Sequence, residues 1–297
     1  MMKWLVFSLS FLIMLSSDSW LGFWMGLEIN TLSFIPILVP QSKEMSLKYF
    51  LVQSLGSVIF LSGVLNPSLV FFCPLGLLLK AGVAPLHFWV LSVVKSMEWI
   101  TVLVFLTVQK LGPLFGLLVN QFQSTLVIFL SILLGSLGGI IQSDTRLILA
   151  FSSISHLGWL IINLSSMSLF FTYFLIYCLI SISLVLILKK LNLGSISQMG
   201  SLGDPISKIS LSFSLLSLGG LPPLLGFLIK WMTVESTLIS LFLIIFLAFS
   251  TCLSLFFYLK ISMIPLLSPY LTSSKSPMGW ETLYAFSLNL MVPLFMI

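Results

Sequence analysis

Residues 168–190 read SLFFTYFLIYCLISISLVLILKK, and the only charges in this segment are the two lysines at its end, Lys189 and Lys190. About 20 mostly apolar residues are enough to cross a bilayer as a helix, and similar runs recur along the whole chain. Hydrophobic residues make up 59% of the 297 residues and charged residues only 7%. A soluble domain carries about 25% charged residues. The sequence therefore predicts an all-α polytopic membrane protein.

We expect about 11 transmembrane helices, because helices satisfy their own backbone groups in lipid and the apolar runs are continuous instead of alternating as in a β-barrel. The first run has no small-residue cleavage site after it and is interpreted as a membrane helix, not a signal peptide. Residues 85–97 are apolar but short, which indicates a re-entrant or lateral half-helix. The expected spans are 2–17, 19–39, 46–66, 69–84, 98–119, 122–141, 145–165, 168–190, 207–230, 234–260 and 279–297.

The basic residues gather on one side of this predicted bundle. The N-terminus and the loops after even-numbered helices hold ten of them, while the opposite loops hold none. The positive-inside rule then predicts that the N-terminus faces the cytoplasm or the mitochondrial matrix. The net charge of +5 follows from this topology, and we expect no binding of nucleic acid. The ten residues are Lys3, Lys43, Lys48, Lys95, Arg146, Lys189, Lys190, Lys208, Lys260 and Lys275.

Four charged residues lie inside predicted spans: Glu28, Lys80, Lys110 and Lys230. Each lysine or acid near the centre of a membrane helix costs about 2.5–3.5 kcal/mol, or about 10–14 kcal/mol for four. Single lysines can extend their ammonium groups to the interface, and a glutamate can be held by structural hydrogen bonds. Four such groups in one chain indicate a proton or cation path instead.

Glu28 and Lys80 are the candidate ion pair. The reference pKa of lysine is about 10.4, so a lysine exchanges its proton near neutral pH only where burial lowers that pKa. A neighbouring carboxylate has the opposite effect and keeps the proton bound. A glutamate and a lysine whose separation changes can therefore act as a switch that loads and discharges the lysine.

Proline interrupts two of the expected spans. Residues 80–89 read KAGVAPLHFW and residues 219–231 read GGLPPLLGFLIKW. These are the fourth and ninth spans, and an odd offset of five helices predicts two inverted five-helix repeats, the plan of ion-coupled transporters with sites at broken helices. The expected division is a first repeat at 1–120, a second at 121–262 and a C-terminal helix at 263–297.

His156 lies in the middle of a predicted span, where a neutral imidazole with two ring nitrogens suits a relay between lysines. A hydrogen-bonded packing histidine is the alternative, and His87 is a weaker candidate. The three cysteines are far apart in apolar runs and are expected to pack in the interior. We expect no metal site, and the chain carries no nucleotide, flavin or haem motif.

Several segments resemble the antiporter-like membrane subunits of respiratory complex I. The resemblance covers residues 20–231 and is carried by WMGLEIN at 24–30, KAGVAPLHFW at 80–89, KLGP at 110–113, SHLGW at 155–159 and the segment from Leu221 to Trp231, with Lys48, Tyr49, Phe50 and Gln53 in addition. Mitochondrially encoded animal members of this family have 11 helices in place of 14, which agrees with the expected count.

The resemblance implies a role for each candidate residue. Glu28 would pair with Lys80, Lys110 would be the central relay lysine, His156 would help to connect the lysines, and Lys230 would lie at the far end of the charged axis. It also implies a multi-pass chain of the mitochondrial inner membrane with other membrane-arm subunits as partners. Flavin, iron–sulfur clusters and quinone would be bound by other subunits.

Three functions remain open from the sequence. The first is a proton-translocating subunit of an assembly that couples NADH oxidation to quinone reduction. The second is a stand-alone cation/proton antiporter, against which the short length and the lack of a carboxylate cluster argue. The third is a scaffold bundle that holds neighbouring subunits and moves no proton.

Overall fold

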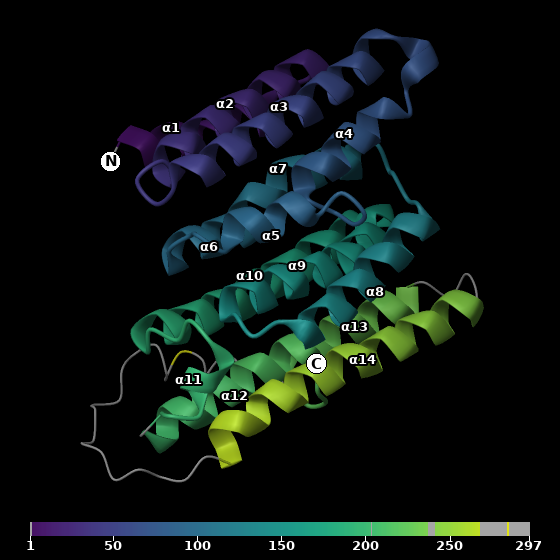
Figure 1. Cartoon of the computed structure of the whole chain (residues 1–297). Coiled ribbons are helices and arrows are strands. Elements are labelled where there is room, and N and C mark those ends of the chain that lie inside the picture. The colour runs from purple at the N-terminus through teal and green to yellow at the C-terminus, as the bar shows by residue number, and fades with distance from the viewer. Residues whose placement is uncertain (1, 203, 237–240, 268–283, 285–297) are drawn as a thin grey trace. The chain divides into compact units, whose positions relative to one another are not determined.

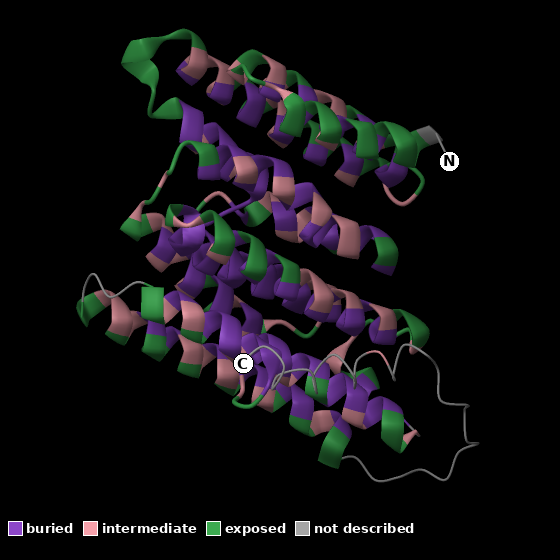
Figure 2. Cartoon of the chain, turned by 180° about the vertical axis from the view of Figure 1, so that it is seen from behind, coloured by how far each residue is buried: buried purple, intermediate pink, exposed green. Residues whose placement is uncertain are grey.

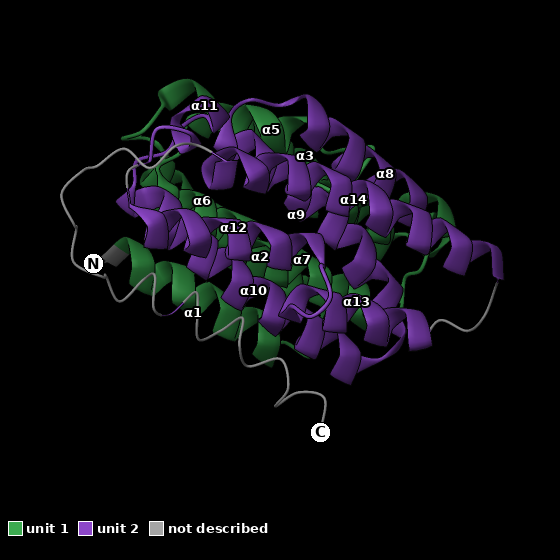
Figure 3. Ribbon diagram, turned by 90° about the horizontal axis from the view of Figure 1, so that it is seen from below, with its two compact units in different colours: residues 1–127 green, residues 128–297 purple. Residues whose placement is uncertain are grey.

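The computed structural model describes residues 2–202, 204–236, 241–267 and 284. Within these residues the secondary structure consists of α-helices and short 3₁₀ turns, with no strand. The chain divides into two compact units, residues 1–127 and 128–297 (Figure 3). The predicted division into repeats at 1–120, 121–262 and 263–297 stays a prediction.

In the first unit, helices that are consecutive in the chain pack against each other. α1 packs on α2, α2 on α3 and α3 on α4, while α4 also packs on α7, as can be followed in Figure 1. Ser19 caps α2 by accepting the Gly22 N–H at 3.2 Å, a common way to begin a helix. The helices are α1 (Met2–Ser16), α2 (Trp20–Leu38), α3 (Lys43–Leu65), α4 (Phe72–Ala81), α5 (Phe88–Val94), α6 (Trp99–Leu106) and α7 (Val108–Val119).

The second unit packs its helices around α9 and α10. α10 contacts α9, α12 and α13, and α12 lies along α14. Nearly all of α9 is buried, so this helix forms the centre of the unit. The helices are α8 (Thr125–Ile141), α9 (Thr145–Ile162), α10 (Met167–Lys190), α11 (Ile196–Met199), α12 (Pro205–Gly219), α13 (Leu225–Ser236) and α14 (Leu241–Leu267).

Apolar residues cover the outside of the helices as well as the inside. Leu51, Leu55 and Val58 form a stripe on α3 and are 58%, 59% and 66% exposed. Figure 2 shows exposed residues on outward helix faces and buried residues where helices meet. Soluble proteins rarely expose contiguous apolar surfaces of this size, so this arrangement is typical of a protein whose outer surface faces lipid.

Six helical stretches among the described residues are long and apolar enough to cross a membrane. They are Trp20–Leu38, Lys43–Leu65, Trp99–Val119, Thr145–Ser165, Met167–Lys190 and Leu241–Leu267. Shorter apolar helices are Lys3–Ser16, Phe72–Ala81 and Thr125–Ile141. The predicted all-helical membrane class is confirmed, whereas the count of 11 helices and the inverted repeat stay predictions. The expected last span, 279–297, lies almost entirely outside the described residues.

The structure interrupts helices at both proline-containing segments. α4 ends before Gly82 and α12 ends before Gly220, and both glycines are left-handed, with φ of 71° and 84°. Glycine adopts this conformation without the steric cost that other residues meet. Residues 88–94 then form the short helix α5, in agreement with the half-helix expected at 85–97.

A third interruption, at Thr107, was not expected: it divides the apolar stretch Trp99–Val119, which agrees with the span predicted at 98–119, into α6 and α7. The Thr107 N–H and hydroxyl both donate to the Leu103 carbonyl, at 3.0 and 2.7 Å, and its φ of −112° and ψ of −82° end α6. Within α7, Pro113 has no N–H to donate to the Gln109 carbonyl four residues earlier.

The basic residues of each unit gather at helix ends. In the first unit, the Lys3 ammonium donates to the Pro36 carbonyl at 2.9 Å. The Ser42 and Ser96 hydroxyls are 2.9 Å apart, so the loops next to Lys43 and Lys95 meet at the same end. In the second unit the Ile196 N–H donates to the Ser143 carbonyl and the Thr145 N–H to the Gly194 carbonyl. These bonds place Arg146 near the end of α10, where Lys189 and Lys190 lie.

Several basic residues assigned to loops lie within helices, among them Lys48 in α3 and Lys260 in α14. Lys208 lies in the first turns of α12, which begins at Pro205, and is only 2% exposed. Lys208 is therefore an interior lysine that the sequence did not identify.

Candidate functional site

Glu28 and Lys80 form an ion pair in the first unit, as the sequence predicted. The Lys80 Nζ atom lies 3.1 Å from Glu28 Oε1. The Lys80 side chain is 1% exposed and the Glu28 side chain 23%. Removing one partner of a buried pair costs about 3–5 kcal/mol, because the other charge is left uncompensated. The two residues therefore depend on each other.

The interruption after α4 supports Lys80. Lys80 lies in the last turn of the helix, where the partial negative charge of the C-terminus favours a cation. The carbonyls at this end are also occupied: the Trp89 Nε1–H donates to Leu79 O at 3.2 Å and the Gln53 amide to Lys80 O at 3.1 Å. A broken helix is tolerated in a membrane where such partners replace the lost backbone bonds.

Lys110 is buried in α7, three residues after the interruption at Thr107, and is 5% exposed. The residue before it, Gln109, donates from its amide to the Tyr49 hydroxyl of α3. Tyr49 is fully buried. This bond fixes the first turn of α7 against α3, on which α4 also packs.

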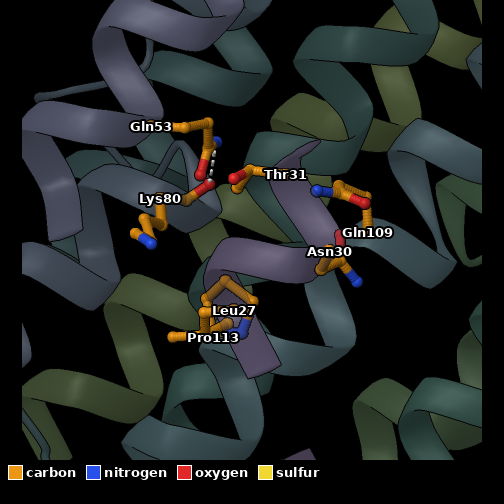
Figure 4. Close-up of a pocket in the computed structure, with 7 residues that line it drawn as sticks. All are labelled: Leu27, Asn30, Thr31, Gln53, Lys80, Gln109 and Pro113. Carbon is orange, nitrogen blue, oxygen red and sulfur yellow. Dashed lines mark hydrogen bonds between the residues drawn. The ribbon is translucent and has the colours of Figure 1, made fainter. Parts of the chain in front are cut away.

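A small cavity separates α2 from α7 in the same unit. Its volume is about 10 Å³, and Figure 4 shows the residues that line it. The Lys80 ammonium points away from the other labelled side chains, whereas the Lys80 carbonyl is bonded to Gln53. The lining residues are Leu27, Asn30, Thr31, Gln53, Lys80, Gln109 and Pro113.

In the second unit, His156 of α9 is 3% exposed and lies against two tyrosines of α10. Its Nδ1 atom is 2.8 Å from the Tyr173 hydroxyl, and its ring centroid is 4.9 Å from that of Tyr177. The bond to Tyr173 fixes the orientation of the imidazole. His156 therefore makes both a ring contact and a hydrogen bond, so its surroundings are compatible with a relay role and with a structural role.

Lys230 lies in α13 and holds the end of α12. Its ammonium donates to Gly219 O at 2.8 Å and to the Ser254 hydroxyl of α14 at 3.3 Å. It also lies 6.0 Å from the centre of the Trp159 ring. Lys230 is 5% exposed, so its side chain is buried within the second unit. A cation at this position is favoured by the partial negative charge at the C-terminus of α12.

Sequence reasoning missed several polar residues that the structure places around these charges. Tyr49, Gln109 and Tyr173 were given no role, and Lys208 was assigned to a loop. One signal was available for Tyr173 and Tyr177, which are four residues apart and therefore lie on one face of a helix. Among the described residues, no group of three His, Cys, Asp or Glu side chains could hold a metal ion.

The fold and the buried charges define a class of membrane proteins. Residues 66–256 match the model of the family described as NADH:quinone oxidoreductase/Mrp antiporter, transmembrane. The fold is also that of a chain in respiratory complex I from Thermus thermophilus (TM-score 0.83, 23% identity, covering 99% of this chain and 76% of that one). A chain of the Mrp complex from Dietzia is similar as well (TM-score 0.76, 18% identity, covering 94% and 62%).

Sequence relatives narrow this class to one branch. NADH-ubiquinone oxidoreductase chain 2 of Artemia franciscana is 48% identical over 295 residues, with 99% of each chain covered. The chain 2 protein of Anopheles gambiae is 40% identical over 278 residues, covering 84% of this chain and 81% of that one. The chain belongs to the NADH-ubiquinone oxidoreductase chain 2 family.

Proposed function

We propose that this chain is a proton-translocating, antiporter-like membrane subunit of respiratory complex I. In this proposal NADH oxidation and ubiquinone reduction take place in other subunits, which hold the flavin, the iron–sulfur clusters and the quinone. The chain lies in the mitochondrial inner membrane with its N-terminus on the matrix side, beside other membrane-arm subunits. Support comes from the names of its relatives and from the buried charges.

The observation that carries the proposal is the ion pair between Lys80 and Glu28 at the end of a broken helix. Charged side chains within a membrane are costly and in general mark ion or proton paths. While the carboxylate lies beside the ammonium, the proton on Lys80 is held. When the two groups separate, the buried lysine loses this support and releases its proton to the next acceptor.

The remaining charged residues extend this path in the proposal. Lys110 is the central relay in the first unit, while His156 and Lys230 serve the second unit. Within the described residues, Lys230 donates to neutral oxygens, those of Gly219 and Ser254, whereas Lys80 donates to a carboxylate. The two lysines therefore bind their protons in different environments, as is useful for a stepwise transfer.

The test is proton pumping by the assembled, reconstituted complex carrying Lys110→Met. We expect assembly to survive and the number of protons moved per NADH oxidised to fall, because methionine keeps the volume of the side chain and removes the titrating group. Lys43→Met, at an exposed position, is the matched control and should pump normally. Normal pumping by Lys110→Met would refute the relay role and favour a scaffold function.

A further inference from the structure

Two amide side chains that line the cavity of the first unit each have a buried oxygen without a hydrogen-bond partner in the described part of the chain. Asn30 Oδ1 and Gln109 Oε1 accept no hydrogen bond within the described residues. Asn30 is 3% exposed and Gln109 is 9% exposed. Leaving a buried acceptor unsatisfied costs about 1–3 kcal/mol, so two of them require an explanation such as a bound water or ion.

The two residues come from different helices and line one cavity. Asn30 belongs to α2 and Gln109 to α7, and both line the cavity of about 10 Å³. In Figure 4 their side chains lie next to each other. The Gln109 amide group is held by its bond to the Tyr49 hydroxyl, which leaves its oxygen available on the other side.

The size of the cavity selects the ligand. A cavity in which about 10–15 Å³ is open to the centre of a water-sized sphere holds one water molecule, provided that two to four polar groups surround it. Thr31 and Gln53 add polar groups to the lining, while Leu27 and Pro113 are its apolar members. Any organic ligand is too large for this space.

We propose that one water molecule binds in this cavity and donates its two hydrogens to Asn30 Oδ1 and Gln109 Oε1. Water is favoured over a metal cation because the side chains in the lining offer neutral oxygens and no carboxylate. A cation would therefore gain no compensating charge from the lining.

The site has a mechanical and a chemical consequence. The water joins Asn30 of α2, the helix that carries Glu28, to Gln109 of α7, the helix that carries Lys110. It also supplies a hydrogen-bonded step between the ion pair and the helix of the central lysine. This second consequence rests on the proposed proton path, whereas the binding of the water does not.

The first experiment is a cryo-electron microscopy map of the assembled complex at a resolution that shows ordered water. We expect one peak about 2.7–3.2 Å from both oxygens, present in sodium-containing and in sodium-free buffer. A cavity without a peak, or two amides rotated onto other partners, would overturn the proposal. A peak that disappears when sodium is replaced by choline would identify a cation and overturn it as well.

Variants test whether the two amides hold the water. Gln109→Met and Asn30→Leu each remove one acceptor from a different helix, and each is expected to abolish the peak. Gln41→Met is the matched control, because Gln41 accepts bonds from Glu98 and Thr101 outside the cavity, and it should leave the peak in place. A peak that persists in both cavity variants contradicts the site.

Proton pumping by these variants separates the site from the path. If the peak is lost and fewer protons are moved per NADH oxidised, the water is part of the proposed path. If the peak is lost and pumping is normal, the water is structural and its proposed chemical role is refuted. Lys110→Met tests the path itself, so the failure of one proposal is distinguishable from the failure of the other.

Discussion

At the scale of single residues, the interior lysines differ in what holds them. Lys80 is paired with a carboxylate, while Lys230 is bound by a backbone carbonyl and a serine hydroxyl. The pairing of Glu28 with Lys80 could be predicted, because few opposite charges were available in the membrane. The partners of Lys230 could not, because a carbonyl becomes an acceptor only where the fold breaks a helix beside it.

A double-mutant cycle tests how strongly Glu28 and Lys80 depend on each other. We expect Glu28→Gln and Lys80→Met each to lower the thermal stability of the assembled complex, and the double variant to lose less than the sum. The reason is that the second substitution removes a charge that the first one left unpaired, with a coupling of about 0.5–3 kcal/mol. Strictly additive losses would mean that the ion pair contributes no mutual stabilisation.

Gly220 is the residue whose replacement should disturb Lys230 most directly. Its φ is 84°, and a Cβ atom there would lie 3.2 Å from the Lys230 Nζ atom. We expect Gly220→Ala to destabilise the second unit by about 1–2 kcal/mol, since left-handed backbone is costly for any residue with a Cβ, and to lower proton pumping.

Gly194→Ala is the control for this substitution, measured by thermal unfolding and by protons moved per NADH. A Cβ at Gly194 would meet only Gln198 Oε1, at 3.7 Å, and its φ lies outside the left-handed range. Equal stability of the two alanine variants would contradict the argument from backbone strain and close approach.

At the scale of the elements, the interruptions in the helices position the site. Those at Gly82 and Gly220 were predictable because proline and glycine act on the neighbouring turns, whatever the tertiary contacts. The one at Thr107 was not, since it involves a hydroxyl that turns back onto Leu103. Which face of α10 meets α9 could not be predicted either, because a helix that is apolar all round shows no hydrophobic periodicity. The spacing of Tyr173 and Tyr177 indicates only that they share a face, not that His156 lies against it.

The carbonyls freed at the end of α4 give a prediction at this scale. Trp89→Phe keeps an aromatic ring near Tyr49 and Phe105 and removes the donor to Leu79 O. Leu79 O keeps its bond from the Gly82 N–H at 3.1 Å but loses the one from the indole, and one hydrogen bond contributes about 0.5–1.5 kcal/mol. Hydrogen exchange at residues 78–94 should therefore become faster.

Trp231→Phe is the matched control for this change, because Trp231 is 59% exposed on α13. Its exchange rates at 78–94 should equal those of the unaltered chain. If Trp89→Phe also leaves these rates unchanged, the indole does not support the end of α4.

At the scale of the whole molecule, the class of protein followed from composition, since no soluble surface can be built with 7% charged residues. The number of helices did not follow as firmly. Six stretches are long enough to span by themselves, and the broken helices reach spanning length only if two short pieces are joined. Whether the number of membrane crossings is odd or even (its parity) therefore depends on whether α4 with α5, and α12 with α13, each cross the membrane once.

Labelling of introduced cysteines from either side of the membrane tests this parity. Glu44→Cys lies beside Lys43 at the basic end of the first unit, Ser197→Cys lies in α11 just beyond Lys189 and Lys190, and Ser68→Cys lies beyond the other end of α3. All three positions are exposed.

The positive-inside rule predicts that an impermeant maleimide modifies Glu44→Cys and Ser197→Cys from the matrix side only and Ser68→Cys from the opposite side only. The unaltered chain, with its own three cysteines, measures background labelling. An odd number of crossings between residues 44 and 197 would place those two cysteines on opposite sides. That outcome would remove both the predicted topology and the inverted repeat that depends on it.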